Sequence, residues 1–272
     1  MSDSANSNGL KTSTVMVNGA EHRVWEKGSG KALGFLPGIG GRPKWLPLFD
    51  TLAEHHRVIV PSLPGFPGAD PSHLSIDDNS DWVCACLDLI EQAGLSGADM
   101  IGACLGGSLL ADVAAHSPAS VGRLALIAPF GLYRNAEPLP DFFAQIFPEQ
   151  KKLLCHRDGA FDKAFAAPED SSDHSIDKEE WDILRYRGME AAARYLWPFG
   201  DRGLEKRLHR VTQDTLLVWG KEDRIIPPSY AEAFAEGIAG TTQIELIDNA
   251  GHLADVDQPD AVAKVLLKYF NV

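Results

Sequence analysis

Short apolar runs alternate along most of the chain with longer stretches in which apolar residues recur at helical spacing. The runs of strand length lie at 32–36, 57–60, 100–101, 124–128, 215–219 and 242–247. The helical stretches lie at 45–54, 75–93, 105–117, 230–238 and after Asp257. Strands and helices that alternate in this way form parallel sheets covered on both faces. The pattern therefore predicts an α/β fold with a mostly parallel, twisted sheet and helices on both of its faces.

The amino-terminal part follows a different pattern. Residues 14–17 and 22–25 alternate between apolar and polar positions around Asn18-Gly19, a pair that favours a tight hairpin turn. We therefore expect the sheet to begin with an antiparallel pair of strands. Residues 1 to about 11 are mostly small and polar, and we expect them to form a disordered tail.

The segment 130–206 interrupts the alternation of strands and helices. It is aromatic, charged and helical in period, and it contains no run rich in Val and Ile that could form a strand. We therefore assign residues 1–129 and 207–272 to an α/β core, and residues 130–206 to a helical cap inserted into that core.

Two helices have a predicted start. In the core, Ser75 is the expected N-cap of the stretch 75–93, because its hydroxyl can accept a hydrogen bond from a free amide of the first turn. In the cap, Asp177 is the expected N-cap of a helix that continues toward Trp197 and ends before Pro198.

Charge and cysteine content exclude several classes of function. Acidic residues outnumber basic residues by 38 to 25, which gives a net charge of −13 and disfavours nucleic acid or an anionic membrane as a partner. The chain begins without the pattern of a signal peptide and has no apolar run of ~18 residues, so we expect a cytoplasmic protein. The four cysteines lack the spacing of a disulfide framework or a metal site. We therefore expect reduced thiols, no metal and no cofactor.

The most informative turn surrounds Cys104. Gly102 and Gly106 flank it at the spacing of a nucleophile elbow, where a strained strand-to-helix turn lifts the central side chain out of the sheet. A thiol at this place can attack a carbonyl carbon. The alternative is a buried structural thiol on an ordinary glycine-rich turn.

Two later turns complete a candidate catalytic triad. One ends in Asp223 and the other in His252, and each follows a predicted strand at the edge where ligands of parallel sheets bind. The order Cys, Asp, His allows a carboxylate to orient an imidazole that accepts the thiol proton. Asp223 could instead be a turn former and His252 a helix cap, and Asp248 is a competing acid.

With these residues the chain resembles the α/β-hydrolase superfamily over nearly its whole length. The motifs that carry the resemblance are Pro37-Gly-Ile-Gly-Gly41, Gly102-Ala-Cys-Leu-Gly-Gly107, Trp219-Gly-Lys-Glu-Asp-Arg-Ile-Ile-Pro227 and Asn249-Ala-Gly-His-Leu253. The resemblance implies an α/β-hydrolase fold with a helical cap. It implies Cys104 as nucleophile, Asp223 as acid and His252 as base, and it implies an oxyanion hole made of the backbone amides of Ile39 and Leu105.

The sequence departs from the usual pattern of that superfamily at two positions. Pro37 stands where most members have histidine, and Cys104 stands where most have serine. The cysteine box is similar to that of dienelactone hydrolases, but the layout is closer to cap-bearing esterases, lactonases and carbon–carbon hydrolases. Cys104 could also be an engineered replacement for a serine.

The resulting hypothesis is hydrolysis of a small carboxylic ester, lactone or thioester through an acyl-cysteine intermediate. Acyl transfer and carbon–carbon bond hydrolysis use the same oxyanion chemistry and remain alternatives. A third alternative is a catalytically silent protein that binds a ligand. The expected partner is a small acyl substrate, and a homodimer is left open. The residues expected to line the substrate site are Gly38, Gly40, Trp181 and Trp197.

Overall fold

The computed structural model describes residues 4–5, 9–167 and 178–271. In these ranges nine strands form a single sheet in the order β1-β2-β3-β5-β4-β6-β7-β8-β9. The strands are β1 (Ser4–Ala5), β2 (Lys11–Val17), β3 (Ala20–Lys27), β4 (Ala32–Leu36), β5 (Arg57–Pro61), β6 (Asp99–Ala103), β7 (Leu124–Ile127), β8 (Thr215–Gly220) and β9 (Thr242–Ile247).

The sheet combines an antiparallel edge with a parallel centre. The chain from β1 to β3 is antiparallel, and β3 pairs antiparallel with β5. All the strands from β5 across to β9 run parallel to one another. The predicted hairpin and the predicted parallel sheet are therefore both confirmed. Because β4, β6 and β7 are neighbours, the residues that follow them meet at one edge of the sheet.

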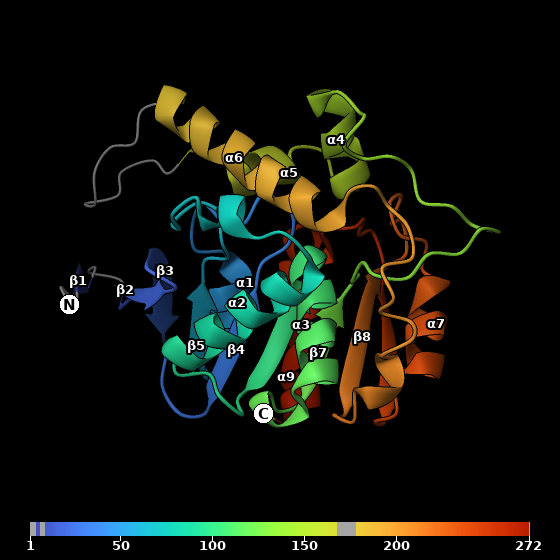
Figure 1. Ribbon diagram of the computed structural model, residues 1–272, viewed down its shortest axis with the longest axis horizontal. Helices are drawn as coiled ribbons and strands as arrows, with labels where there is room; N and C mark the ends of the chain where they lie inside the picture. The colour runs from blue at the N-terminus through green and yellow to red at the C-terminus, as the bar shows by residue number, and fades with distance from the viewer. Residues whose placement is uncertain (1–3, 6–8, 168–177, 272) are drawn as a thin grey trace.

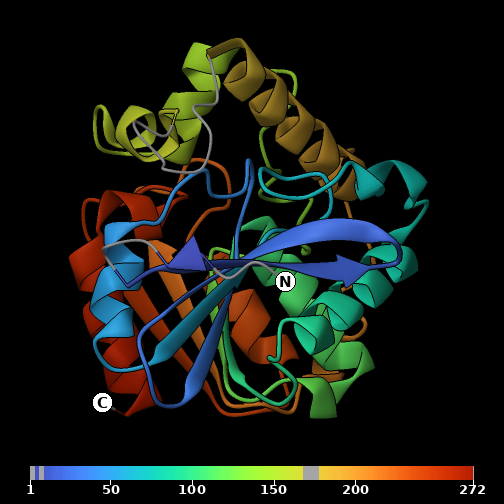
Figure 2. The ribbon, with the colours of Figure 1, turned by 90° about the vertical axis from the view of Figure 1, so that its left-hand side faces the viewer.

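Helices cover both faces of this sheet. Figure 2 shows the sheet between α1 (Pro47–Ala53) and α9 (Pro259–Phe270) on its left and α2 (Asn79–Gln92) and α3 (Leu105–His116) on its right. Helix α7 (Tyr230–Gly237) packs against β8 and β9, and the one-turn helix α8 (Ala254–Asp257) precedes α9. Three 3-10 turns connect these elements, at Ser72–Ser75, Pro118–Ser120 and Leu208–Arg210. Nearly every residue of β6, β7 and β8 is buried, as expected of strands covered on both faces.

Three further helices lie together above one end of the sheet (Figure 1). They are α4 (Phe147–Leu154), α5 (Ala160–Phe165) and α6 (Lys178–Leu196), and they come from the segment between β7 and β8. A β-carbon on Gly188 of α6 would lie 3.6 Å from the carbonyl oxygen of Gly40, in the loop after β4. This group of helices therefore covers the edge of the sheet at which the parallel strands end.

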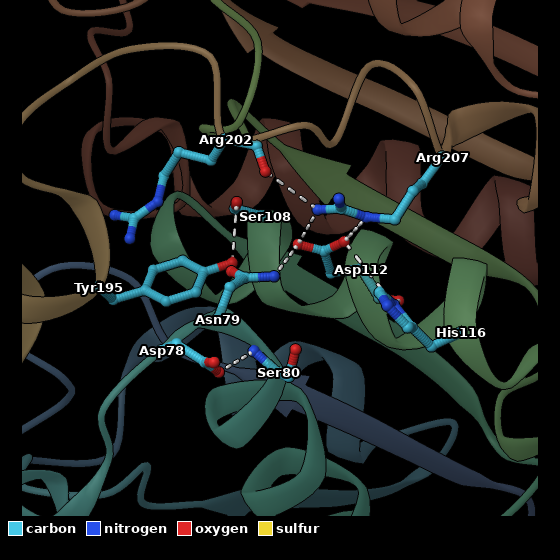
Figure 3. Close-up of polar contacts among 9 residues, drawn as sticks. All are labelled: Asp78, Asn79, Ser80, Ser108, Asp112, His116, Tyr195, Arg202 and Arg207. Atoms are coloured by element: carbon cyan, nitrogen blue, oxygen red, sulfur yellow. Dashed lines mark hydrogen bonds and ion pairs between the residues drawn. The ribbon is translucent and has the colours of Figure 1, made fainter.

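A buried polar cluster joins the segment that returns from the cap to helix α3 (Figure 3). The guanidinium of Arg207 donates from Nε and Nη2 to the two oxygens of Asp112, at 2.8 and 3.2 Å. Asn79 of α2 also donates to Asp112, at 3.0 Å, and the hydroxyls of Ser108 and Tyr195 lie 3.2 Å apart. Helices α2, α3 and α6 are thus connected just below the cap.

The structure corrects two expectations from the sequence, one about the start of α2 and one about the amino-terminal tail. Ser75 is not the N-cap of α2, because it ends a 3-10 turn, and Asp78 caps the helix by accepting from the amides of Ser80 and Asp81. The predicted tail is wrong at Lys11, which begins β2 and pairs with Ala5. The expected cap Asp177 lies outside the described residues.

Candidate active site

Cys104 occupies a strained turn between β6 and α3. Its φ of 54° and ψ of −118° lie outside the regions that most side chains adopt. The flanking glycines allow this turn: a β-carbon on Gly102 would lie 2.7 Å from the carbonyl oxygen of Gly106, and one on Gly106 would lie 2.3 Å from that of Leu36. The predicted strand–turn–helix geometry is therefore present, with the thiol at its apex.

The loop after β4 lies directly against this thiol. A β-carbon on Gly38 would lie 2.6 Å from Cβ of Cys104 and 3.2 Å from its Sγ. Gly41 donates to the carbonyl of Gly38 at 2.9 Å, which closes a tight turn around Ile39. Leu105 is the first residue of α3, so its amide has no partner within the helix. We name residues 37–41 the oxyanion turn.

Asp223 and His252 form a buried hydrogen-bonded pair. His252 Nδ1 lies 2.9 Å from Asp223 Oδ2, and both side chains are fully buried. The other carboxylate oxygen accepts from the amides of Ile225 and Ile226 at 2.8 and 3.0 Å, which fixes the carboxylate in place. The competing acid Asp248 instead pairs with Lys221, at 2.5 Å.

The imidazole of His252 interacts both with this carboxylate and with Cys104. Its Nε2 is buried and has no hydrogen bond of ordinary geometry among the described residues, but the ring lies near enough to Cys104 for that side chain to act on it as a charge and as a hydrogen-bond partner. Burial disfavours the charged ring, but the charges of Asp223 and Cys104 and the hydrogen bond to Asp223 outweigh burial and raise the pKa of His252 to about 10. The three residues of the predicted triad therefore meet in one place.

An aromatic cluster stands beside the imidazole. The ring of Phe130 meets that of His252 edge to face, with centroids 5.2 Å apart. Phe199 stacks on Phe130 at 5.2 Å and on Phe143 at 5.6 Å. The sequence signal for Phe130 is its place just beyond the end of β7, at the same edge of the sheet as Cys104.

The other predicted substrate-site residues are distributed around the cap. Gly40 contacts the cap, because a β-carbon there would lie 3.5 Å from the ring of Phe165. Trp181 is buried and lines a surface depression with Arg23 and Arg187. Trp197 is 54% exposed. Neither tryptophan takes part in the aromatic cluster beside His252, and their role in substrate binding stays a prediction.

Three charged residues that the sequence analysis did not single out support the catalytic loops. Asp257 accepts from the amides of Gly251, His156 and Arg157, at 2.8, 2.7 and 3.1 Å, and so joins the His252 loop to the cap. Arg42 and Asp255 form a buried ion pair. Arg42 lies in an irregular loop, and Asp255 and Asp257 lie in the one-turn helix α8, which is too short to give a periodic signal, so only the structure identifies these residues.

The described residues contain neither a candidate metal site nor a candidate membrane-spanning helix. No group of three or more His, Cys, Asp or Glu side chains in the ranges above is placed to hold a metal ion. Among the same residues, no helix combines the length and the apolar character that a membrane crossing requires.

Comparisons with known proteins agree with this fold. The profile of the Alpha/beta hydrolase family matches residues 35–265. The chain is 25% identical to a 2-hydroxymuconate semialdehyde hydrolase of a Pseudomonas species, with 93% of this chain and 91% of that protein covered. It is 27% identical to the dihydrolipoyllysine-residue acetyltransferase component of an acetoin cleaving system of Cupriavidus necator, with 94% and 68% covered.

A similar fold occurs among solved structures. A serine hydrolase involved in carbazole degradation superposes with a TM-score of 0.74 at 21% identity, over 96% of this chain and 98% of that one. The family match spans most of the chain, including the elbow and the two loops that carry Asp223 and His252. The chain belongs to the alpha/beta hydrolase family.

Proposed function

We propose that this hydrolase cleaves a small carboxylic ester, lactone or thioester through an acyl-cysteine on Cys104. The observation that supports the proposal is that Asp223 holds Nδ1 of the fully buried His252, while the charge of Cys104 and a hydrogen bond to it help to raise the pKa of the same imidazole. A thiol that can transfer its proton to an oriented imidazole is an activated nucleophile.

In the acylation step, Cys104 Sγ bonds to the carbonyl carbon while His252 holds the thiol proton on Nε2. The carbonyl π electrons move to the oxygen, which we place on the amides of Ile39 and Leu105. When the carbonyl reforms, the bond to the leaving alcohol or thiol breaks. The leaving group takes the proton from His252, and the acyl group stays on sulfur.

Deacylation uses the same groups with water as the nucleophile. Water gives a proton to His252 Nε2 as its oxygen attacks the thioester carbon, and the oxyanion again lies on the two amides. The carbon–sulfur bond then breaks and releases the free acid. The sulfur leaves as a thiolate beside the protonated His252, which is the proton arrangement from which acylation began.

Replacing the thiol tests the proposal directly. We expect Cys104→Ala to abolish turnover of a panel of p-nitrophenyl esters, lactones and acyl thioesters, while Cys84→Ala, which changes an exposed cysteine, retains it. An unchanged rate in Cys104→Ala would refute the proposal. A large gain of activity in Cys104→Ser would identify serine as the nucleophile to which the site is adapted.

Acyl transfer and carbon–carbon bond hydrolysis are the second candidates, because two relatives are named for an acetyltransferase and for a 2-hydroxymuconate semialdehyde hydrolase. Product analysis in the presence of a competing thiol separates them: a transferase yields the conjugate, and an ester hydrolase yields the free acid. Hydrolysis of 2-hydroxymuconate semialdehyde into two separate products would support carbon–carbon cleavage.

A silent ligand-binding protein is the remaining alternative. Intact-mass measurement after incubation with p-nitrophenyl acetate distinguishes it, because an enzyme acquires a transient acetyl group that Cys104→Ala lacks. If each protein kept its own unmodified mass and neither released nitrophenol, the binding role would be favoured.

A further inference from the structure

We propose that the buried ion pair of Arg42 and Asp255 is a positioning device that fixes the oxyanion turn relative to His252. The inference rests on the proposed function, because the turn matters only if an oxyanion forms there. Arg42 directly follows the turn, and Asp255 lies three residues after His252. The pair therefore joins the two loops that must act on the same carbonyl group.

The guanidinium contacts both loops at once. Its Nη2 binds Asp255 Oδ2, and its Nη1 donates to the carbonyl of Gly41 at 2.9 Å. Arg42 is 2% exposed and Asp255 is 1% exposed, so water does not screen the contact. The two residues are 213 positions apart in the sequence, and the ion pair brings them together.

Each partner is itself held by a rigid environment. The carbonyl of Arg42 accepts from Arg23 Nη2 at 3.0 Å, and its guanidinium lies 5.6 Å from the ring of Phe165 of the cap. Asp255 belongs to α8, whose Asp257 accepts from the amide of Gly251, next to His252. Movement at one end of the pair is therefore transmitted to a catalytic loop at the other end.

Stability alone does not account for this pair. A buried ion pair often contributes no more to folding than an apolar pair of similar volume. Here Arg42 Nε and Asp255 Oδ1 are also buried without a hydrogen-bond partner among the described residues, which adds a desolvation cost. The pair instead fixes the orientation of the two loops. The planar guanidinium donates from separate nitrogens, so it can hold a carbonyl of the turn and a carboxylate beyond His252 at the same time.

The test compares Arg42→Met, Asp255→Leu and the double variant. Each single change leaves a buried charge without its partner, so we expect a lower urea midpoint for both. The double variant removes both charges and is expected to regain most of the parent midpoint. Its kcat for a p-nitrophenyl ester should nevertheless be about 100-fold lower, with KM within about twofold, because a small displacement of the oxyanion donors is enough. A parent-like kcat in the double variant would overturn the proposal.

A matched control changes another ion pair at the opposite end of β6. Asp99 pairs with Arg123 at 2.8 Å, at the first residue of that strand. The double variant Asp99→Leu with Arg123→Met should keep the parent kcat, whatever it does to stability. Arg42→Lys keeps the charge without the two-armed geometry, and we expect its kcat to lie between those of the parent and the double variant.

Hydrogen exchange separates this proposal from the proposed function. In the double variant, amides of the peptide 36–46 should exchange at least about tenfold faster than in the parent, while the peptide 99–110 stays protected. This readout needs no substrate, so it decides the positioning role even if the parent hydrolyses none of the panel. Equal exchange of peptide 36–46 in both proteins would overturn the positioning role, and turnover by the parent would still support the proposed function.

Discussion

The protonation of His252 links the site to folding. In the unfolded chain the imidazole titrates near 6.5, and in the folded protein the neighbouring charges raise its pKa to about 10. The folded state therefore binds a proton that the unfolded state releases between these values. This contribution to the free energy of unfolding is fully present below pH 6.5 and is lost as the pH rises toward 10.

We therefore expect the urea midpoint of the parent to fall as the pH is raised from 7 to 10. His252→Gln removes the titrating group, so its midpoint should fall less over the same range, although it starts lower at pH 7. The measurement is the difference between the two pH profiles. Parallel profiles would show that His252 does not carry the raised pKa.

For single residues, the sequence predicted which side chains share an edge of the sheet, but it did not predict which side chains connect one loop to another. Cys104, Asp223 and His252 follow parallel strands, so topology alone places them together. Arg42 lies in an irregular loop and Asp255 in the one-turn helix α8, and neither segment is long enough for a periodicity that indicates which side chain turns inward.

Among the elements, the elbow depends on the close approach of α3 to the end of β4. A β-carbon on Gly106 would lie 2.3 Å from the carbonyl oxygen of Leu36 and 2.5 Å from that of Pro37. Both are backbone atoms of the segment that leads into the oxyanion turn. Any side chain at position 106 must therefore displace that turn from the thiol.

Gly106→Ala should lower the free energy of unfolding by about 3 kcal/mol and reduce kcat together with it, because the strain of overpacking falls on the backbone. Gly200→Ala is the matched control: a β-carbon there has open space, and its φ is not positive. It should change stability by less than about 0.5 kcal/mol. Urea unfolding and ester turnover of both variants provide the comparison, and similar losses in the two would contradict this reading of the elbow.

Element boundaries show where sequence reasoning loses precision. Ser75 and Asp78 are both good cap residues, and the structure uses Asp78 because the chain first completes a 3-10 turn at Ser72–Ser75. The choice depends on how the preceding loop packs, since His73 of that turn is fully buried. The sequence therefore indicates both candidate N-cap residues, but it does not indicate the conformation of the preceding loop, which decides between them.

For the molecule as a whole, we expect the relation of the cap to the core to decide which acyl groups fit. Phe199 comes from the segment after α6 and lies in the aromatic cluster beside His252, whereas Trp197 is 54% exposed. Helical period does not distinguish these two aromatic residues, since both belong to the irregular end of the cap. Their different placement sets up a direct comparison.

Phe199→Ala should lower kcat/KM about tenfold for aryl-acyl esters and less for acetyl esters, because it removes a ring from the stack that reaches His252. Trp197→Ala should change neither value by more than about twofold. Steady-state kinetics on paired benzoyl and acetyl esters of the same alcohol tests this. A larger effect in Trp197→Ala would instead support the direct substrate contact predicted for that residue.

Cys104 is fully buried, whereas Cys84 is exposed. An alkylating reagent can therefore reach Cys104 only when a local motion of the surrounding segments exposes it. As the reagent concentration rises, labelling of Cys84 keeps accelerating in proportion, but labelling of Cys104 levels off at the rate of opening itself. We expect this limiting rate to report how often the thiol becomes exposed, and the same rate would set an upper limit on how often a substrate can reach it.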